Sequence, residues 1–246
     1  MMDYDSYQFS SRDISEIVLI SAAITVGIMC LFYRSIFAGI LFPILLVWQT
    51  KSVREKRIFH RREQLEQEFV NGIMVLNSSL QAGLSMENAW REVEKETRIL
   101  YGEKAFLYQE LKEMNQRTAH NIPIEKLFLE FAYRCKVEDV IQFAEILEYG
   151  KRSGSNWKRM IDATVNRISE RYEAKQEIEV MIAEKKMEQQ IMNLMPLGIL
   201  AFLQFSAWDY MSVLYHNWLG VIAMTVFLLL YVAAIVLSQR IMKVEV

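Results

Sequence analysis

The sequence predicts an all-α membrane protein, in which an antiparallel six-helix cytoplasmic bundle lies between two pairs of transmembrane helices. The composition is 52% hydrophobic with a mean hydropathy of +0.09, yet charged residues make up 24% of the chain. The long apolar runs are confined to the two ends, and the charged residues are concentrated between them. Only 3 prolines and 9 glycines occur in 246 residues, so few turns interrupt the expected helices.

Two uncharged runs near the N-terminus are separated by Arg34, and the second of them contains Pro43. A helix needs roughly 20 apolar residues to cross the hydrocarbon core, with about 17 as the lower limit. We therefore expect residues 1–16 to form a tail and residues 17–50 a transmembrane hairpin of two short spans. A cleaved signal peptide fits poorly, because acidic residues replace its basic first segment and a second apolar run follows at once.

Two further apolar runs lie near the C-terminus. We expect residues 191–208 to form the third span, 209–217 a short extracytoplasmic loop, 218–238 the fourth span and 239–246 a cytoplasmic tail. Tryptophan and tyrosine residues frame the loop, as is typical of a membrane interface. Asn193 and Gln204 are the strongly polar side chains of the third run, and they favour contacts between spans over ion conduction.

Positive residues set the expected orientation. Six of them follow the second apolar run, and further ones precede the third run and follow the fourth, so four spans place all of these clusters in the cytoplasm. If the second run does not cross, the chain has three spans and an outside N-terminus. The six-residue cluster sets topology or contacts anionic lipid, and it lacks the interleaved aromatic residues of a nucleic-acid site. Its members are Lys51, Arg54, Lys56, Arg57, Arg61 and Arg62.

Residues 51–186 form the expected cytoplasmic domain, and its first helix hairpin is marked by a glycine and a serine. Phe69, Ile73 and Leu76 are spaced by 4 and 3, the pattern of one buried helix face. That helix is expected to stop at Gly83 in a left-handed cap, and Ser85 is expected to cap the next helix, residues 86–98. The short connection makes the two helices antiparallel.

The remaining helices of the bundle follow from the same kind of signal. Residues 101–118 are expected to form the third helix, and Asn121 and Pro123 to begin the fourth, residues 124–134. A fifth helix starts at residue 138 and is expected to end where Gly150 and Gly154 break the chain. Ser155 or Asn156 would then cap the sixth. The glycine-flanked basic residues 150–154 form either a plain turn or an anion site at a helix N-terminus.

The sixth helix is expected to be long. From Trp157 onwards, apolar residues recur at spacings of about three and four, and no helix breaker precedes Pro196. Because Pro196 lies inside the third apolar run, this helix is expected to pass from the bundle directly into the membrane. Movement of the bundle would then be coupled mechanically to the spans.

No motif for catalysis or cofactor binding stands out, so we expect neither an enzyme nor a bound cofactor. The three histidines lack metal-ligand spacing, and neither a phosphate-binding loop nor a nucleophile elbow occurs. Cys30 and Cys135 lie in dissimilar segments, so a disulfide is not expected. Acidic residues mostly alternate with basic ones, which is typical of a solvated face. Alternatively, acidic clusters dock a partner, and the candidates are Glu92, Glu94, Glu96, Glu177 and Glu184.

Three segments, in order, resemble the type II secretion system F-domain family. They are "FVNGIMVLNSSLQAGLSMENAWREVEKE", "NIPIEKLFLEFAYRCKVEDVIQFAEIL" and "GKRSGSNWKRMIDATVNRISERYEAKQEIEVMIAEKKMEQQIMNLMP". Together they cover about residues 65–200. The family usually has glycine where Asn121 stands. Within the family, the chain is most similar to TadB-type platform proteins of Tad pili, and the TadC type is the alternative.

The resemblance implies a platform in a bacterial inner membrane, beneath a pilus or a secretion machine. Its implied partners are a cytoplasmic hexameric secretion ATPase, a second platform protein, pilin or pseudopilin subunits, membrane lipid and further copies of the chain. No catalytic residues belong to the family pattern. A membrane signalling protein is the alternative class, but the expected outside loop is too short for a sensing domain. A membrane-embedded hydrolase would need reactive groups that the spans lack.

Overall fold

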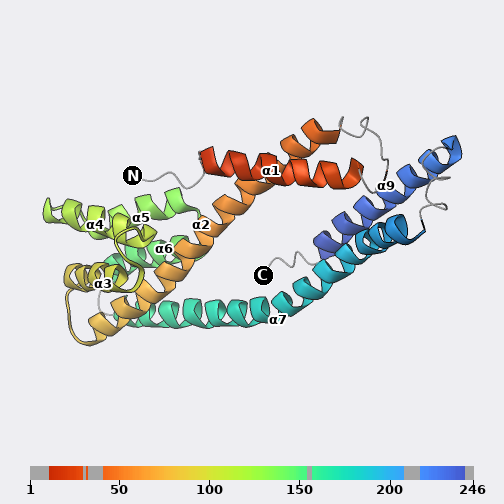
Figure 1. Ribbon diagram of the computed structural model, residues 1–246. Helices are drawn as coiled ribbons and strands as arrows, with labels where there is room; N and C mark the ends of the chain where they lie inside the picture. The colour runs from red at the N-terminus through yellow and green to blue at the C-terminus, as the bar shows by residue number, and fades with distance from the viewer. Residues whose placement is uncertain (1–10, 30–31, 33–40, 154–156, 208–216, 242–246) are drawn as a thin grey trace. The chain divides into compact units, whose positions relative to one another are not determined.

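The computed structural model describes residues 11–29, 32, 41–153, 157–207 and 217–241, and the described residues form eight helices and no strands. The all-helical prediction is therefore confirmed for this part of the chain. The helices are shown in Figure 1, and they are α1 (Ser11–Ile28), α2 (Leu41–Gln81), α3 (Met86–Tyr101), α4 (Phe106–Ala119), α5 (Ile124–Cys135), α6 (Glu138–Ser153), α7 (Trp157–Ser206) and α9 (Trp218–Ile241).

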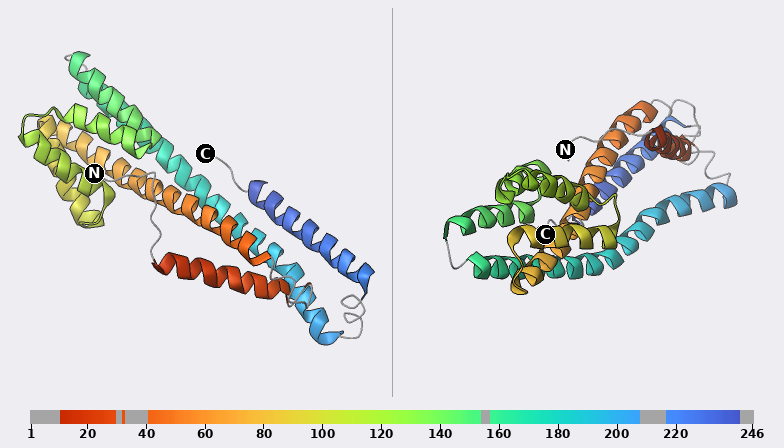
Figure 2. Two further views of the ribbon diagram at one scale, coloured as in Figure 1. Left: turned by 90° about the horizontal axis from the view of Figure 1, so that it is seen from above. Right: turned by 90° about the vertical axis from the view of Figure 1, so that its left-hand side faces the viewer.

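The chain divides into two compact units. Among the described residues, the first unit holds residues 54–174 and the second holds residues 11–53 and 175–241. We call the first unit the bundle and the second the apolar unit. In the bundle, α3 packs beside α4 and α5 beside α6 (Figure 2). The helices α2 and α7 each run without interruption from one unit into the other.

Aromatic side chains form the centre of the bundle. The rings of Trp90 in α3 and Phe128 in α5 lie 4.8 Å apart, and those of Phe69 in α2 and Phe143 in α6 lie 5.7 Å apart at 73°. All four are fully buried. Tilted and edge-to-face rings at these distances attract each other beyond the gain from burial. Four helices are thereby joined at one point, and the predicted buried face of α2 is confirmed.

The turn between α2 and α3 has the geometry that the sequence suggests. Gly83 has a φ of +92°, and its N–H donates to the Leu80 carbonyl at 3.1 Å. The N–H of Leu84 reaches back to the Ser79 carbonyl at 3.1 Å, which completes a Schellman motif. Ser85 then begins α3, and its hydroxyl accepts a hydrogen bond from a backbone N–H one turn on.

The start of α4 and the start of α5 differ from the prediction. Tyr101 is the last residue of α3, and Gly102, at a φ of +82°, separates it from α4, which begins at Phe106 rather than at residue 101. Asn121 does not cap α5: it has a φ of +63° and follows the end of α4. Pro123 is itself the N-cap of α5, one residue before the first turn in which it was expected.

The predicted break at Gly150 is wrong. The helix α6 continues through Gly150 to Ser153, and Gly150 is buried. A Cβ atom at Gly150 would lie 3.2 Å from the Cβ of Trp157 at the start of α7. The glycine therefore serves close packing between two helices, and residues 150–153 are not a loop that could hold an anion. Gly154, Ser155 and Asn156, the other predicted turn and cap residues, lie outside the described residues.

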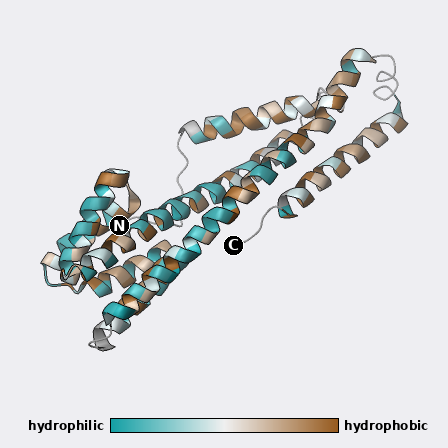
Figure 3. Ribbon diagram, turned by 90° about the horizontal axis from the view of Figure 1, so that it is seen from below, coloured by the Kyte–Doolittle hydropathy of each residue, from teal (hydrophilic) through white to brown (hydrophobic). Residues whose placement is uncertain are grey.

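Both long helices join polar to apolar sequence. The 50 residues of α7 include Pro196 without a break, as predicted, whereas the continuity of α2 over 41 residues was not predicted. Figure 3 shows hydrophobic residues along α9 and hydrophilic ones on the middle of α2 and of α7. The sequence did contain a sign that α2 is continuous, because neither glycine nor proline occurs between Pro43 and Gly72.

One described helix has the length and composition of a membrane span. The stretch Trp218–Ser238 of α9 has 21 residues and a mean hydropathy of 2.7, and only 6% of it is buried within the chain. The 18 residues of α1 include Arg12, Asp13 and Glu16, and the residues between α1 and α2 lie mostly outside the described ranges. The arrangement of two pairs of spans therefore stays a prediction.

Candidate functional site

Only the first part of α7 is buried in the bundle, and this burial ends at Ser169. The buried residues of α7 are Ile161, Thr164, Val165, Ile168 and Ser169. These fall on one face at spacings of three and four, so they dock the first turns of the helix on the core. From Glu170 to Ser206, every residue of α7 is at least partly exposed.

Two aspartates tie the docked part of α7 to its neighbours. Asp162 accepts hydrogen bonds from the side-chain amides of Asn77 at 2.7 Å and Gln81 at 2.9 Å, both at the end of α2. On the other side, Asp139 of α6 is 1% exposed and pairs with Arg171. Because an unpaired buried carboxylate is costly, this ion pair holds α7 in register with α6. The exit of α7 is thus fixed to both α2 and α6.

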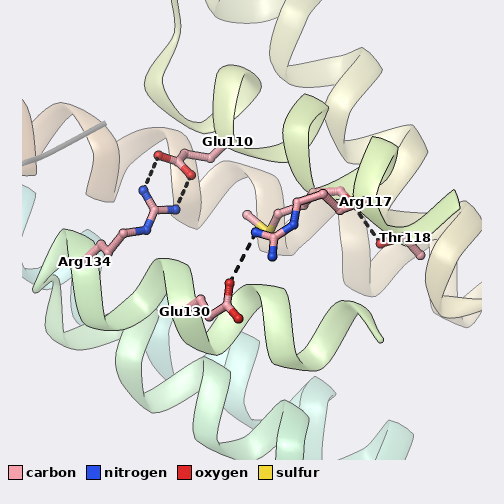
Figure 4. Close-up of polar contacts among 6 residues, drawn as sticks. Glu110, Arg117, Thr118, Glu130 and Arg134 are labelled. Atoms are coloured by element: carbon pink, nitrogen blue, oxygen red, sulfur yellow. Dashed lines mark hydrogen bonds and ion pairs between the residues drawn. The ribbon is translucent and has the colours of Figure 1, made fainter. Parts of the chain in front are cut away.

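A second pair of ionic contacts joins α4 to α5 (Figure 4). The guanidinium of Arg134 donates to both oxygens of Glu110, at 3.1 and 2.6 Å, and Glu110 is only 4% exposed. Arg117 donates to Glu130 at 3.3 Å, in a more exposed setting. The two-pronged geometry between Arg134 and Glu110 is the stronger form of such a contact. The bundle is therefore closed by ionic contacts as well as by its core.

Glu68 was missed in the sequence analysis, although it is fully buried in α2. Its carboxylate accepts a hydrogen bond from the backbone N–H of Leu107 at 2.8 Å and another from Gln64 at 3.0 Å. Ala105, the N-cap of α4, offers no side-chain acceptor, so Glu68 caps α4 from a neighbouring helix. Burial raises the pKa of Glu68, and the hydrogen bonds oppose that rise. The sequence pattern that could have identified Glu68 is a charged residue three positions after Leu65, on the apolar face of the helix.

The predicted acidic contact residues do not form one patch. Glu94 accepts a hydrogen bond from Asn115 of α4 at 2.7 Å, so it serves the interior of the bundle. Glu92 pairs with Lys95 at 3.0 Å on the surface, and this contact raises the pKa of Lys95. Glu96, one turn after Glu92, is half-buried. The other two candidates, Glu177 and Glu184, are exposed on the part of α7 that belongs to the apolar unit.

The exposed side of α3 combines acidic and apolar residues. Glu92, Glu96 and Ile99 are spaced by four and three and so lie on one helix face, and Ile99 is 66% exposed. Leu100, the next residue, is 61% exposed. Glu103 follows four residues after Ile99 and pairs with Arg98 at 2.6 Å. We call Glu92, Glu96, Ile99 and Leu100 the α3 face.

The predicted basic cluster lies entirely on α2. Lys51, Arg54, Lys56 and Arg57 are exposed, and the last two members, Arg61 and Arg62, are partly buried. Val47 and Trp48, which precede the cluster, are each 60% exposed. Apolar side chains followed at once by cations are typical of a helix that emerges from a bilayer into water.

Within the apolar unit, neighbouring helices are joined by polar groups. The hydroxyl of Tyr231 in α9 donates to the backbone carbonyl of Asn193 in α7 at 2.6 Å. The Gln189 side chain donates to the Ser238 hydroxyl at 2.5 Å. Sequence reasoning expected the side chain of Asn193 to make such a contact, but its main-chain oxygen does so. A pocket of about 450 Å³ lies beside these contacts and is lined by residues of both helices, including Met192, Pro196 and Ala234.

A corresponding contact joins the first two helices. The hydroxyl of Ser21 in α1, which is fully buried, donates to the side chain of Gln49 in α2 at 2.6 Å. Thr25, one turn on, donates to the Ser21 carbonyl of its own helix. Small and polar residues are the usual means of joining helices where the surroundings are apolar.

The described residues hold no cluster of three or more histidines, cysteines or acids that could bind a metal ion. Cys135 is buried, its thiol donates to the Ala132 carbonyl, and burial raises its pKa to about 11. A thiol with that pKa stays protonated near neutrality and is a poor nucleophile. What the structure does provide is a set of firmly joined helices, two of which extend into apolar sequence. Comparison with known proteins finds no matching family model, no curated relative and no solved structure.

Proposed function

We propose that this chain is an inner-membrane platform protein of a Tad-like pilus or a type II-like secretion machine. In that role it couples a cytoplasmic hexameric ATPase to the assembly of pilin subunits or to secretion. One observation carries the proposal: α7 continues without a break from the buried core of the bundle to Pro196 and beyond. The resemblance of three ordered sequence segments to the F-domain family gives the observation its context.

A continuous helix transmits displacement, because its backbone hydrogen bonds resist local bending. At the bundle end, α7 is docked by Ile161, Val165 and Ile168 and tied through Asp162 and Arg171. The helix α2 offers a second such connection, from the apolar residues before Lys51 to the core at Leu65. A force applied to the bundle would therefore reach the apolar unit along two helices.

The apolar unit supplies the membrane anchor in this proposal. The helix α9 has the properties of a span, and its partner is the final part of α7, to which it is joined by hydrogen bonds. Four spans place Lys51, Lys185 and Arg240 on one side of the bilayer, which the positive-inside rule assigns to the cytoplasm. In this proposal the bundle, which lies between Lys51 and Lys185 in the sequence, is therefore cytoplasmic.

The α3 face is proposed as the surface that meets the ATPase. Its carboxylates and its exposed Ile99 and Leu100 suit a partner surface that carries both basic and apolar residues. Glu94 is not part of this surface, because it bonds to Asn115 of the neighbouring helix α4, whereas Glu92 pairs with a surface residue of its own helix. Of the three predicted contact residues on α3, this proposal keeps Glu92 and Glu96.

Site-specific photo-crosslinking in the native host tests the proposal. A photoreactive residue is placed at Ile99, on the α3 face, and at Gln109, which is exposed on α4 and serves as the control position. We expect the Ile99 variant to capture a secretion ATPase and the Gln109 variant not to do so. A second platform protein should copurify with both. Capture of a kinase or another regulator at Ile99, with no ATPase, would replace the platform proposal with a signalling one.

A further inference from the structure

Pro196 leaves a gap in the hydrogen bonds of α7. Proline has no backbone N–H, so the carbonyl of Met192, four residues earlier, receives no helical hydrogen bond from position 196. Such positions bend readily, because the ring of the proline also pushes against the preceding turn. In apolar surroundings the Met192 carbonyl needs a donor from elsewhere.

The neighbouring helix donates a hydrogen bond to the next carbonyl of this turn, that of Asn193, rather than to the Met192 carbonyl. The carbonyl of Asn193, three residues before Pro196, accepts the hydrogen bond from the Tyr231 hydroxyl at 2.6 Å. The contact between Gln189 and Ser238, at 2.5 Å, lies one turn earlier on α7. The two contacts run in opposite directions along α7 and α9, as expected for antiparallel helices. They fasten α9 to the turn that proline weakens.

The same turn lies against open space. The pocket of about 450 Å³ is lined on α7 by Met192, Asn193 and Pro196, and on α9 by Tyr231 and Ile235 among others. Side chains therefore do not fill the angle between the two helices there. With little packing beside it, the backbone geometry of this turn depends on the hydrogen bonds more than it would in a close-packed interface.

We propose that Tyr231 is a positioning residue, whose hydroxyl holds the proline-weakened turn of α7 in a single conformation. Breaking this hydrogen bond frees α7 to change its angle at Pro196, and the pocket gives it space to do so. Under the proposed function, which this last step requires, the contact decides whether displacement of the bundle moves the end of α7 or is absorbed at the turn. The local role of Tyr231 does not depend on that function.

The test is a distance measurement within α7 of the full chain in lipid nanodiscs. Spin labels are attached at Ala183→Cys and Phe202→Cys, two exposed positions on either side of Pro196, after Cys30 is replaced by serine. We expect one narrow distance distribution in the otherwise unchanged chain. Tyr231→Phe keeps the ring but removes the donor, and it should raise the population of a second distance roughly three- to tenfold.

Two further variants separate positioning from packing. Pro196→Ala restores an N–H at position 196, so Tyr231→Phe should no longer alter the distances in that background. Thr225→Val removes another α9 hydroxyl, one that donates to the Val221 carbonyl of its own helix, and it should leave the distribution narrow. An unchanged distribution in Tyr231→Phe overturns the proposal. Equal broadening with and without Pro196 does so too, because it would mean that the hydroxyl acts elsewhere.

Flotation with liposomes tests the membrane assignment separately. If the chain does not float, the membrane part of the proposed function fails. The distances are then measured in buffer, where the same comparison of variants decides the role of Tyr231. If the chain floats and the distances behave as expected but Ile99 captures no ATPase, the role of Tyr231 stands without the platform proposal.

Discussion

The bundle and the apolar unit contain similar side chains that lie in opposite environments. In the bundle, Trp90, Phe128 and Leu111 are fully buried by other parts of the chain. In the apolar unit, Phe202 is 67% exposed and Leu229 is 65% exposed, and Met224 is the buried apolar residue of α9. Exposed apolar surface on this scale marks a face that another phase or another molecule covers. The first unit is stabilised by its own core, whereas the second leaves most of its described apolar side chains exposed.

The largest difference between the units in the free energy of unfolding is expected when one large side chain is removed from each. Trp90→Ala should lower the free energy of unfolding by about 3–5 kcal/mol, because it empties the centre of the aromatic core. Phe202→Ala should change it little, because that side chain is 67% exposed. Both are measured by denaturant unfolding of the full chain in detergent micelles. An equal loss in the two variants would contradict the contrast between the units.

Removing one ion pair from each unit is expected to give a difference in stability of intermediate size. Arg134→Ala leaves the buried Glu110 without its partner and should cost about 2–3 kcal/mol. Lys185→Ala removes an ion pair with Glu188 that has a similar distance, 3.0 Å, but is exposed, so the stability should not change measurably. Thermal unfolding of the two variants against the parent chain measures the difference. A loss at Lys185 as large as at Arg134 would show that the exposed pair lies in a covered interface.

Glycine substitutions probe the backbone of the two units. Gly83→Val forces a β-branched residue into a φ of +92° and should destabilise the bundle by about 1–3 kcal/mol. Gly198→Ala places a methyl group in open space within α7 and should be neutral or slightly stabilising. Hydrogen exchange of the α2–α3 turn reports the first effect directly. Unchanged exchange there in Gly83→Val would refute the proposed role of the turn.

The smallest expected effect concerns the pH dependence of the bundle. Burial raises the pKa of Glu68 above its usual value of 4.5, so the folded state holds this proton more tightly than the unfolded state does. Its contribution to stability is therefore present below pH 4.5 and is lost as the pH rises through the folded pKa. Glu68→Gln removes that loss while keeping one acceptor for the Leu107 N–H.

The measurement compares unfolding free energies of Glu68→Gln and the parent chain between pH 4 and pH 7 (a range of about three units around the shift). The difference, variant minus parent, should rise with pH. Glu184→Gln makes the same charge change on an exposed side chain of the apolar unit and serves as the control. A difference that falls with pH would mean that hydrogen bonding, rather than burial, dominates at Glu68.

Local signals determined much of the bundle in advance. Ser85, Gly83 and Pro123 mark helix ends within one or two residues of where they occur, because capping and left-handed turns depend on neighbours in sequence. The sequence also predicted that α7 continues from Trp157 past Pro196, since no helix breaker interrupts its apolar pattern before that proline. The all-helical class and the candidate span in α9 follow from composition and periodicity alone.

The contacts between helices were decided by the tertiary structure. Asparagine is a common N-cap residue, but Asn121 lies just after the C-terminal end of α4 instead of capping α5. The N-terminal end of α4 is capped by Glu68, which belongs to a different helix. Gly150 looks like a helix breaker but makes room for Trp157. At Asn193 the bonding group is the backbone carbonyl, because Tyr231 lies opposite it. The physical reason is common to these cases: the free energy of a buried polar or close-packed group depends on atoms distant in sequence, which local patterns do not specify.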